Sequence, residues 1–327
     1  MKTICTGLFV LACAAQPSAA QTGGRLVVLN KDDATLVTID AASGRILGTV
    51  ATGEGPHEVA VSDDGRWAFA ANYGERTPGS SISMIDLAAM KESRRIDVTP
   101  LRRPHGLVFL DGRLYFTSET NRLIGRYDPQ ADKIDWLMGT GQTGTHMLWV
   151  SADGARIVTC NIGSNSMTLL ERAAANPLNW STTTIAVGKG PEGFDVSPDG
   201  REVWAAHSGD GGVSIIDLAA RKVTATIDAG TKRSNRLKFT RDGRHALISD
   251  VDSGDLVVID VATRSIARRL PVGRNPEGIL IAPDGATAFV AVAGDNNIAV
   301  VDLNTWTVAR RIEPGRGPDG MAFVPSR

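Results

Sequence analysis

A unit of just over forty residues recurs along this chain, and the number of copies restricts the fold. Each unit opens on a polar residue at a corner, usually after Gly-Pro or Arg-Pro. The seven opening residues are His57, His105, His146, Glu192, Asn235, Glu277 and Asp319. Successive positions differ by 48, 41, 46, 43, 42 and 42 residues. A fixed period of this length is typical of propellers and solenoids, in which each unit buries its surface against the next.

The repeat from residue 275 to residue 315 has the pattern of a four-stranded antiparallel sheet. Four short runs rich in β-branched residues are separated by turn signals. The Pro283–Gly285 turn between the first two runs strongly favours a β-hairpin, because glycine accepts a positive φ without steric cost. Such a sheet cannot cover both of its faces, so it needs neighbouring copies.

The two ends of the chain supply complementary parts of one blade. Residues 320–324 form a seventh first strand with no partner after it, and residues 26–30, 36–40 and 46–50 form second, third and fourth strands with no first. Joining them closes a ring and leaves no exposed edge. The sequence therefore predicts an all-β, seven-bladed β-propeller of four-stranded antiparallel blades, with the last blade closed by the C-terminal strand joining the N-terminal strands.

Residues 1–20 have the pattern of an export signal, with Lys2 before an apolar run and Pro-Ser-Ala-Ala at the end. The interpretation is a periplasmic or secreted protein whose residues 21–327 form a single propeller domain. Lipid attachment at Cys13 is the alternative. No later run is long enough to cross a bilayer, and the net charge of −1 gives no basic stripe for nucleic acid.

The cysteine content limits which covalent bonds and cofactor attachments the chain can form. Cys160 is the single cysteine after the leader, so no disulfide can form within the chain, and we expect it to be a small buried hydrophobe. The sequence contains no Cys-x-x-Cys-His haem attachment site and no nicotinamide or quinone signature.

The seven opening corners should lie together on one face, because every first strand starts at the mouth of the central tunnel. The inserted loop from Tyr73 to Ser80 joins a second strand to a third, so it belongs to the same face, whereas the insertion at 172–180 belongs to the opposite one. His207 ends a second strand and should also lie on the corner face.

Two interpretations of this polar ring stay open. In the first, the corner residues are polar only because water reaches the tunnel mouth. In the second, they form a binding site: His57, His105 and His146 are candidate ligands for a divalent metal such as Zn, Cu, Ni or Mn. Glu192 and Glu277 are then candidate catalytic bases. The candidate ligand-binding residues are Tyr73, His207, Asn235, Arg236 and Asp319. Arg236 could bind a carboxylate or phosphate in a bidentate manner.

The repeat resembles the YVTN-type β-propeller family. The resemblance rests on the corner, the Ser/Ala-Pro-Asp-Gly turn after the first strand, an aromatic second strand and the Val-x-Val-Ile-Asp third strand, and it is best in 191–230 and 276–315. It implies an exported propeller that serves as a surface-layer, ligand-binding or accessory protein. Related propellers include lactonases and antibiotic lyases with a metal on the axis, and nitrous oxide reductase with copper in a full ring of histidines. Only three corners here carry histidine.

Three functions follow as hypotheses. The first is an exported propeller that binds a small ligand at the tunnel mouth, with a divalent metal as one means of doing so. The second is a metal-assisted hydrolase or lyase of the lactonase-like kind. The third is a non-enzymatic platform for a protein partner on the corner face, and in each case we expect a monomer.

Overall fold

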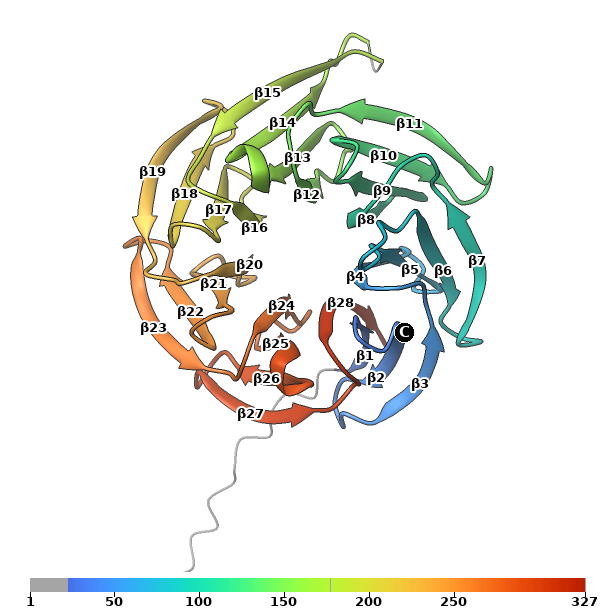
Figure 1. The fold of residues 1–327 in the computed structure, drawn as a ribbon. Helices are drawn as coiled ribbons and strands as arrows, with labels where there is room; N and C mark the ends of the chain where they lie inside the picture. The colour runs from blue at the N-terminus through green and yellow to red at the C-terminus, as the bar shows by residue number, and fades with distance from the viewer. Residues whose placement is uncertain (1–22, 177, 327) are drawn as a thin grey trace, which may run out of the picture.

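Short runs of β-branched and aromatic residues fold into strands because their side chains suit a pleated, buried surface. The computed structural model describes residues 23–176 and 178–326, and within them these runs form seven four-stranded antiparallel sheets arranged in a ring (Figure 1). The predicted seven-bladed propeller is confirmed. The predicted leader, residues 1–20, lies outside the described residues.

Each blade contributes one strand to each of four concentric positions. The innermost strands are β4 (Pro56–Val61), β8 (Pro104–Leu110), β12 (Thr145–Val150), β16 (Pro191–Val196), β20 (Ser234–Phe239), β24 (Pro276–Ile281) and β28 (Pro318–Pro325). The second strands are β5 (Trp67–Asn72), β9 (Arg113–Ser118), β13 (Arg156–Asn161), β17 (Glu202–His207), β21 (His245–Asp250), β25 (Thr287–Val292) and β1 (Gly24–Asn30). The third strands are β6 (Ser81–Asp86), β10 (Leu123–Asp128), β14 (Ser166–Arg172), β18 (Gly212–Asp217), β22 (Asp255–Asp260), β26 (Asn297–Asp302) and β2 (Thr35–Asp40). The outer strands are β7 (Lys91–Asp97), β11 (Lys133–Gly139), β15 (Trp180–Ala186), β19 (Lys222–Asp228), β23 (Ser265–Pro271), β27 (Thr307–Ile312) and β3 (Ile46–Ala51). Two short 3₁₀ turns, η1 (Ile162–Ser164) and η2 (Ala293–Asp295), follow second strands.

The ring is closed by strand pairing between the two ends of the chain. β28 pairs antiparallel with β1, with Gly24 opposite Pro325 and Asn30 opposite Pro318. Blade seven therefore has the order β28-β1-β2-β3, and Figure 1 shows β28 beside β1 at the inner edge of the ring. Because backbone hydrogen bonds join the ends, this seam has no unpaired inner edge.

The hydrophobic core lies between neighbouring blades. Second strands are buried on both faces: the five residues from Ala288 to Val292 in β25 are fully buried. Trp204 of blade four is fully buried and meets Phe239 of blade five edge-on, with ring centroids 5.4 Å apart. Outer strands such as β19 instead alternate between exposed and partly buried residues, with Ile227 alone buried in that strand. The blades are thus held together by face-to-face packing, which requires each to have a neighbour.

Cys160 lies in β13 within the packing of blades three and four and is fully buried. Its Sγ accepts a hydrogen bond from the backbone N–H of Met147 at 3.4 Å and donates one to the carbonyl of Glu192 at 3.2 Å. Burial raises the pKa of this thiol to about 12. The structure confirms the prediction of a small buried residue, and a buried thiol with a raised pKa is expected to be unreactive.

The two insertions lie at opposite ends of their strands. The backbone N–H of Tyr73 donates to the carbonyl of Gly55, next to an opening corner, at 3.2 Å. The backbone N–H of Arg172 donates to the carbonyl of Ala155, beside the turn between the first and second strands of blade three. In the part of the chain that the structure describes, no helix has both the length and the apolar character needed to span a membrane.

Candidate functional site: the tunnel mouth

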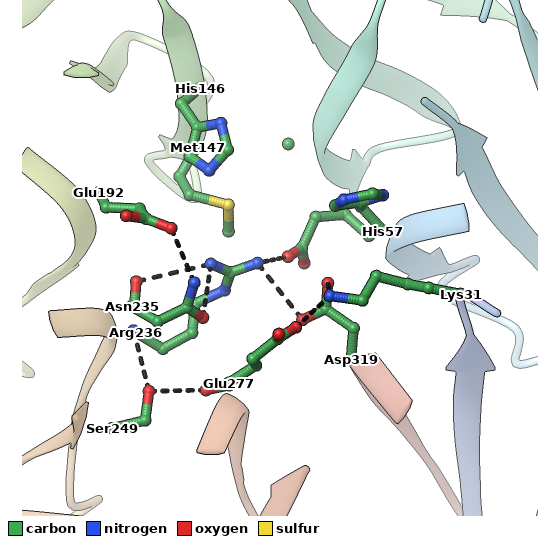
Figure 2. Close-up of polar contacts among 12 residues, drawn as sticks. Lys31, His57, His146, Met147, Glu192, Asn235, Arg236, Ser249, Glu277 and Asp319 are labelled. Carbon is green, nitrogen blue, oxygen red and sulfur yellow. Dashed lines mark hydrogen bonds and ion pairs between the residues drawn. The ribbon is translucent and has the colours of Figure 1, made fainter. Parts of the chain in front are cut away.

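A bulge at the start of each first strand carries the corner residues. In blade one, Pro56 pairs with Asn72 and the next pair is Val59 with Ala70, so that two residues, His57 and Glu58, stand against one on the partner strand. The same shift occurs in the first strands of all seven blades. Bulges of this kind change the direction in which side chains point. Here they direct the corner residues toward the axis of the ring, at the end where the first strands start (Figure 2). We call this place the tunnel mouth.

The second position of the bulge distinguishes the blades. Four blades have glycine there, at Gly106, Gly193, Gly278 and Gly320. A Cβ on Gly278 would lie 2.2 Å from the carbonyl oxygen of Asp319, so glycine lets the next corner approach closely. The remaining three blades have Glu58, Met147 and Arg236 at this position. These three blades therefore place a long side chain where the others have none.

An ion-pair network occupies one half of the mouth (Figure 2). The guanidinium of Arg236, in blade five, donates to the carboxylate of Glu58 in blade one, and its Nη2 lies 3.8 Å from Oδ1 of Asp319. Lys31, from the loop after β1, donates to Glu277 and lies 3.5 Å from Oδ2 of Asp319. Arg236 is only 5% exposed. The network thus ties together residues from blades one, five, six and seven.

Asn235 and Ser249 extend this network. Asn235 Nδ2 donates to Oε1 of Glu192 at 2.7 Å, and its own Oδ1 accepts from Nη1 of Arg236 at 3.1 Å. Ser249 Oγ accepts from the backbone N–H of Arg236 at 3.0 Å and donates to the carbonyl of Glu277 at 2.7 Å. Arg236 is therefore fixed at both its backbone and its guanidinium group.

Imidazole and phenol rings occupy the other half of the mouth. The rings of His105 and His146 are in contact, with centroids 3.7 Å apart and planes inclined by 31°, and His57 lies 5.3 Å from His105. Tyr73 packs 4.6 Å from His57 and donates its hydroxyl hydrogen to Glu119. Nδ1 of His146 lies 3.5 Å from Oε1 of Glu119, too long for a good hydrogen bond. Blades one, two and three thus form an aromatic wall.

The shielded position of these groups changes their pKa values. Burial lowers the pKa of His57 and lowers that of His105 well below its usual range, so both imidazoles are neutral at pH 7. Burial raises the pKa of Glu58. It also opposes ionisation of Asp319, but Lys31 and Arg236 outweigh that effect and lower the pKa of this carboxyl. Glu277 has its pKa raised to about 7, by burial first and then by the charge of Asp319.

The raised pKa of Glu277 predicts a dependence of stability on pH. The folded protein retains a proton that the unfolded chain releases near its ordinary pKa of 4.5, so the stabilisation is complete below that pH and is lost as the pH rises through about 7. Glu277→Gln should remove this dependence of the unfolding free energy on pH, because a glutamine beside Lys31, Asp319 and Arg236 does not titrate. We expect wild type to lose about 1–3 kcal/mol relative to the variant between pH 5 and pH 7.5. Urea unfolding of both proteins at several pH values measures this, and parallel curves would contradict it.

Most of the residues predicted from sequence meet at this mouth. The structure brings together His57, His105 and His146 on one side and Arg236, Glu277 and Asp319 on the other, with Asn235 and Glu192 beside them and Tyr73 against the histidines. His207 is different: it is 1% exposed, and its Nδ1 lies 2.8 Å from Oδ1 of Asp210, outside the contacts described above. Arg236 already binds carboxylates of the protein itself.

Sequence reasoning missed Lys31, Glu58, Glu119 and Met147. Two signals could have found them. Lys31 and Glu119 hold the same place as Tyr73, directly after the second strand, in consecutive blades. Glu58 and Met147 occupy the position that is glycine in four other blades. In both cases the position within the repeat identifies a residue that contributes a side chain to the mouth.

Two of the three candidate metal ligands, His105 and His146, have their rings in contact in this arrangement. Rings in contact at 3.7 Å pack against each other, whereas ligands of one ion spread around it. Within residues 23–176 and 178–326, no group of three or more His, Cys, Asp or Glu side chains is placed to hold an ion. Metal binding at His57, His105 and His146 stays a prediction of the sequence.

Comparison with known proteins agrees with the class of fold. Residues 131–286 match the model of the YNCE-like beta-propeller family. A provisionally assigned 6-phosphogluconolactonase from Bacteroides uniformis ATCC 8492 has a TM-score of 0.78 at 16% identity, over 93% of this chain and all of that one. Hydrazine synthase from Kuenenia stuttgartiensis gives 0.75 at 17% identity, over 90% and 99% of the two chains. These findings support a seven-bladed β-propeller, and at such identities the solved structures show the fold alone.

One curated protein is similar in sequence over a shorter stretch. The dihydro-heme d1 dehydrogenase of Pseudomonas aeruginosa PAO1 is 33% identical over 114 residues, which is 35% of this chain and 22% of that protein. A solved structure of dihydro-heme d1 dehydrogenase NirN in complex with DHE has a TM-score of 0.64 at 15% identity, over 95% of this chain and 77% of that one. The aligned stretch spans about a fifth of the curated relative.

Proposed function

We propose that the chain is an exported propeller that binds a small polar ligand at the tunnel mouth. The observation that carries this is the set of long side chains at Glu58, Met147 and Arg236. The other four blades have glycine at the same position, so a blade can fold without a long side chain there. Burying the guanidinium of Arg236 costs free energy, and an apolar side chain at that position would avoid this cost. Side chains that are kept despite a cost in stability are expected at a binding site.

The chemistry of the mouth supports a ligand held by several blades at once. Fixed charges and amides lie on one side and an aromatic wall on the other, and side chains held by neighbouring contacts need little reordering when a ligand binds. Export, predicted from residues 1–20, would give such a site its ligand in the periplasm or outside the cell. The likeness to a dihydro-heme d1 dehydrogenase makes a tetrapyrrole one compound to include in any screen.

A thermal-shift screen of the mature protein tests this proposal. The panel contains amines, sugars, carboxylates, haem and zinc chloride, and a ligand that binds only the folded protein raises the melting temperature in a saturable manner. We expect at least one organic compound to do so, and Lys31→Met or Asn235→Ala to abolish the rise. Lys232→Met is the matched control, because Lys232 is exposed on the loop before β20. A shift that survives both mouth variants, or no shift from any compound, would refute the proposal.

A second candidate is a hydrolase or lyase of the lactonase-like kind. It is favoured by Glu277, whose pKa of about 7 suits a general base at neutral pH and whose carboxylate contacts Lys31. Adding lactones and esters to the same panel, with turnover as the readout, separates catalysis from binding alone.

A further inference from the structure

The tunnel mouth contains more carboxylates than cations. Its acidic side chains are Glu58, Glu119, Glu192, Glu277 and Asp319. Its basic side chains are Lys31, Arg236 and Arg103, the last of which lies 4.4 Å above the ring of Tyr73. Both cations of the network are already engaged: Arg236 with Glu58 and Asp319, and Lys31 with Glu277 and Asp319. An anionic ligand would have to displace a carboxylate of the protein from one of them.

Buried atoms without hydrogen-bond partners lie in the same mouth. Oδ1 of Asp319 has no hydrogen-bond partner among the described residues, although Asp319 is only 2% exposed. Nδ1 of His105, a residue that is 1% exposed, has no partner either. Nδ1 of His146, which is 7% exposed, also makes no hydrogen bond, although it faces Oε1 of Glu119 at 3.5 Å. A carboxylate oxygen can only accept, and a neutral imidazole presents one accepting nitrogen. Buried polar atoms that the protein leaves unsatisfied call for an outside partner, and at Asp319 this partner must be a donor.

We infer that the ligand of this mouth is a small organic cation whose ammonium or guanidinium N–H groups are donated to Asp319 and its neighbouring carboxylates. This inference rests on the proposed function, because it names the class of ligand for the same site. Oδ1 of Asp319 has Arg236 as an ionic neighbour at 3.8 Å but accepts no hydrogen bond. A cationic donor supplies that hydrogen bond and also offsets the excess of carboxylates, whereas a neutral hydroxyl supplies the hydrogen bond alone. Hydrogen bonds between two charged groups are also the stronger ones.

The arrangement of acceptors favours an organic cation over a bare metal ion. Asp319 and Glu277 belong to the ionic half of the mouth, and the imidazoles of His105 and His146 belong to the aromatic wall. No three of the described acidic, histidine or cysteine side chains are grouped to coordinate one ion. A cation of several atoms can reach separated acceptors, and its methylene groups can lie against Met147 and the aromatic wall.

Three compounds of similar length but different charge test the inference. Putrescine carries two ammonium groups, 1,4-butanediol two hydroxyls and succinate two carboxylates, so their comparison isolates charge. In isothermal titration calorimetry of the mature protein, we expect putrescine to bind at least tenfold more tightly than the other two. Asp319→Asn and Glu277→Gln should each weaken putrescine binding by tenfold or more. Glu313→Gln, at an exposed carboxylate on the loop before β28, should leave it unchanged.

Each outcome separates this inference from the proposed function. Preference for succinate or 1,4-butanediol, with sensitivity to the mouth variants, would overturn the inference and keep a ligand site at the mouth. Putrescine binding that Asp319→Asn and Glu277→Gln do not affect would overturn it as well, as would no binding of any of the three. Should Asp319→Asn fail to fold, Glu277→Gln and Glu192→Gln carry the test, since both residues are less buried than Asp319, and each should weaken putrescine binding.

Discussion

Glu58→Ala is expected to lower the free energy of unfolding by about 3–5 kcal/mol. The variant removes the carboxylate that accepts hydrogen bonds from Arg236 and leaves a guanidinium that is 5% exposed without its main partner. Asp319, at 3.8 Å, compensates only in part, because it also faces Lys31. The effect is large because the cost is that of a buried charge, and it is measured by urea unfolding at pH 7.

Two further variants isolate the cause. The double variant Glu58→Leu with Arg236→Met should be close to wild type in stability, because apolar side chains of similar size often replace a buried ion pair without loss. Glu92→Ala breaks the exposed pair with Arg95, on the outer strand of the same blade, and should cost less than about 1 kcal/mol. If the double variant were as unstable as Glu58→Ala, the loss would come from packing and not from the unpaired charge.

Removing residues 318–327 is expected to abolish cooperative folding. β28 supplies the inner hydrogen-bonded partner of β1 from Gly24 to Asn30, and it contributes Val324 to the packing between blades seven and one. Without it the ring has a gap, and the buried faces of its neighbours meet water. Natural domains are stable by only about 5–15 kcal/mol, so the loss of a whole inner strand exceeds what the remaining blades can absorb.

Thermal unfolding followed by circular dichroism, together with gel filtration, measures this effect. Removing only residues 326 and 327 is the matched control and should leave the unfolding transition unchanged, because the strand ends at Pro325. A single sharp transition near the wild-type temperature in the protein that lacks 318–327 would show that the seam between the ends is not essential.

The fold was predictable because its signals are local and repeated. A turn such as Pro283–Gly285 and a run such as residues 288–292 favour a hairpin locally, and seven copies leave few ways to cover their faces. The corner residues were predictable for the same reason, because a regular repeat places equivalent positions around one axis. His57 and Glu277 could thus be assigned to one site although 220 residues separate them in the sequence.

The contacts within the site were not predictable from the repeat. Arg236 was a candidate to bind a carboxylate or phosphate, and in the folded protein it is engaged by Glu58, which is 178 residues away. Its partner depends on the width of the mouth and on how far each bulge turns its side chain, and no local pattern records either quantity. The packing of the His105 ring against that of His146, both candidate metal ligands, is likewise a contact that the repeat does not record.

The sequence by itself determined the number of blades, the closure by the two ends and the face on which the polar corners gather. These follow from short-range turn chemistry and from the period of the repeat. Only the tertiary structure decided which charges neutralise each other and which acceptors, such as Oδ1 of Asp319, are left without a donor. Electrostatic pairing depends on distances across the tunnel and on exclusion of water, and both exist only after the ring has closed.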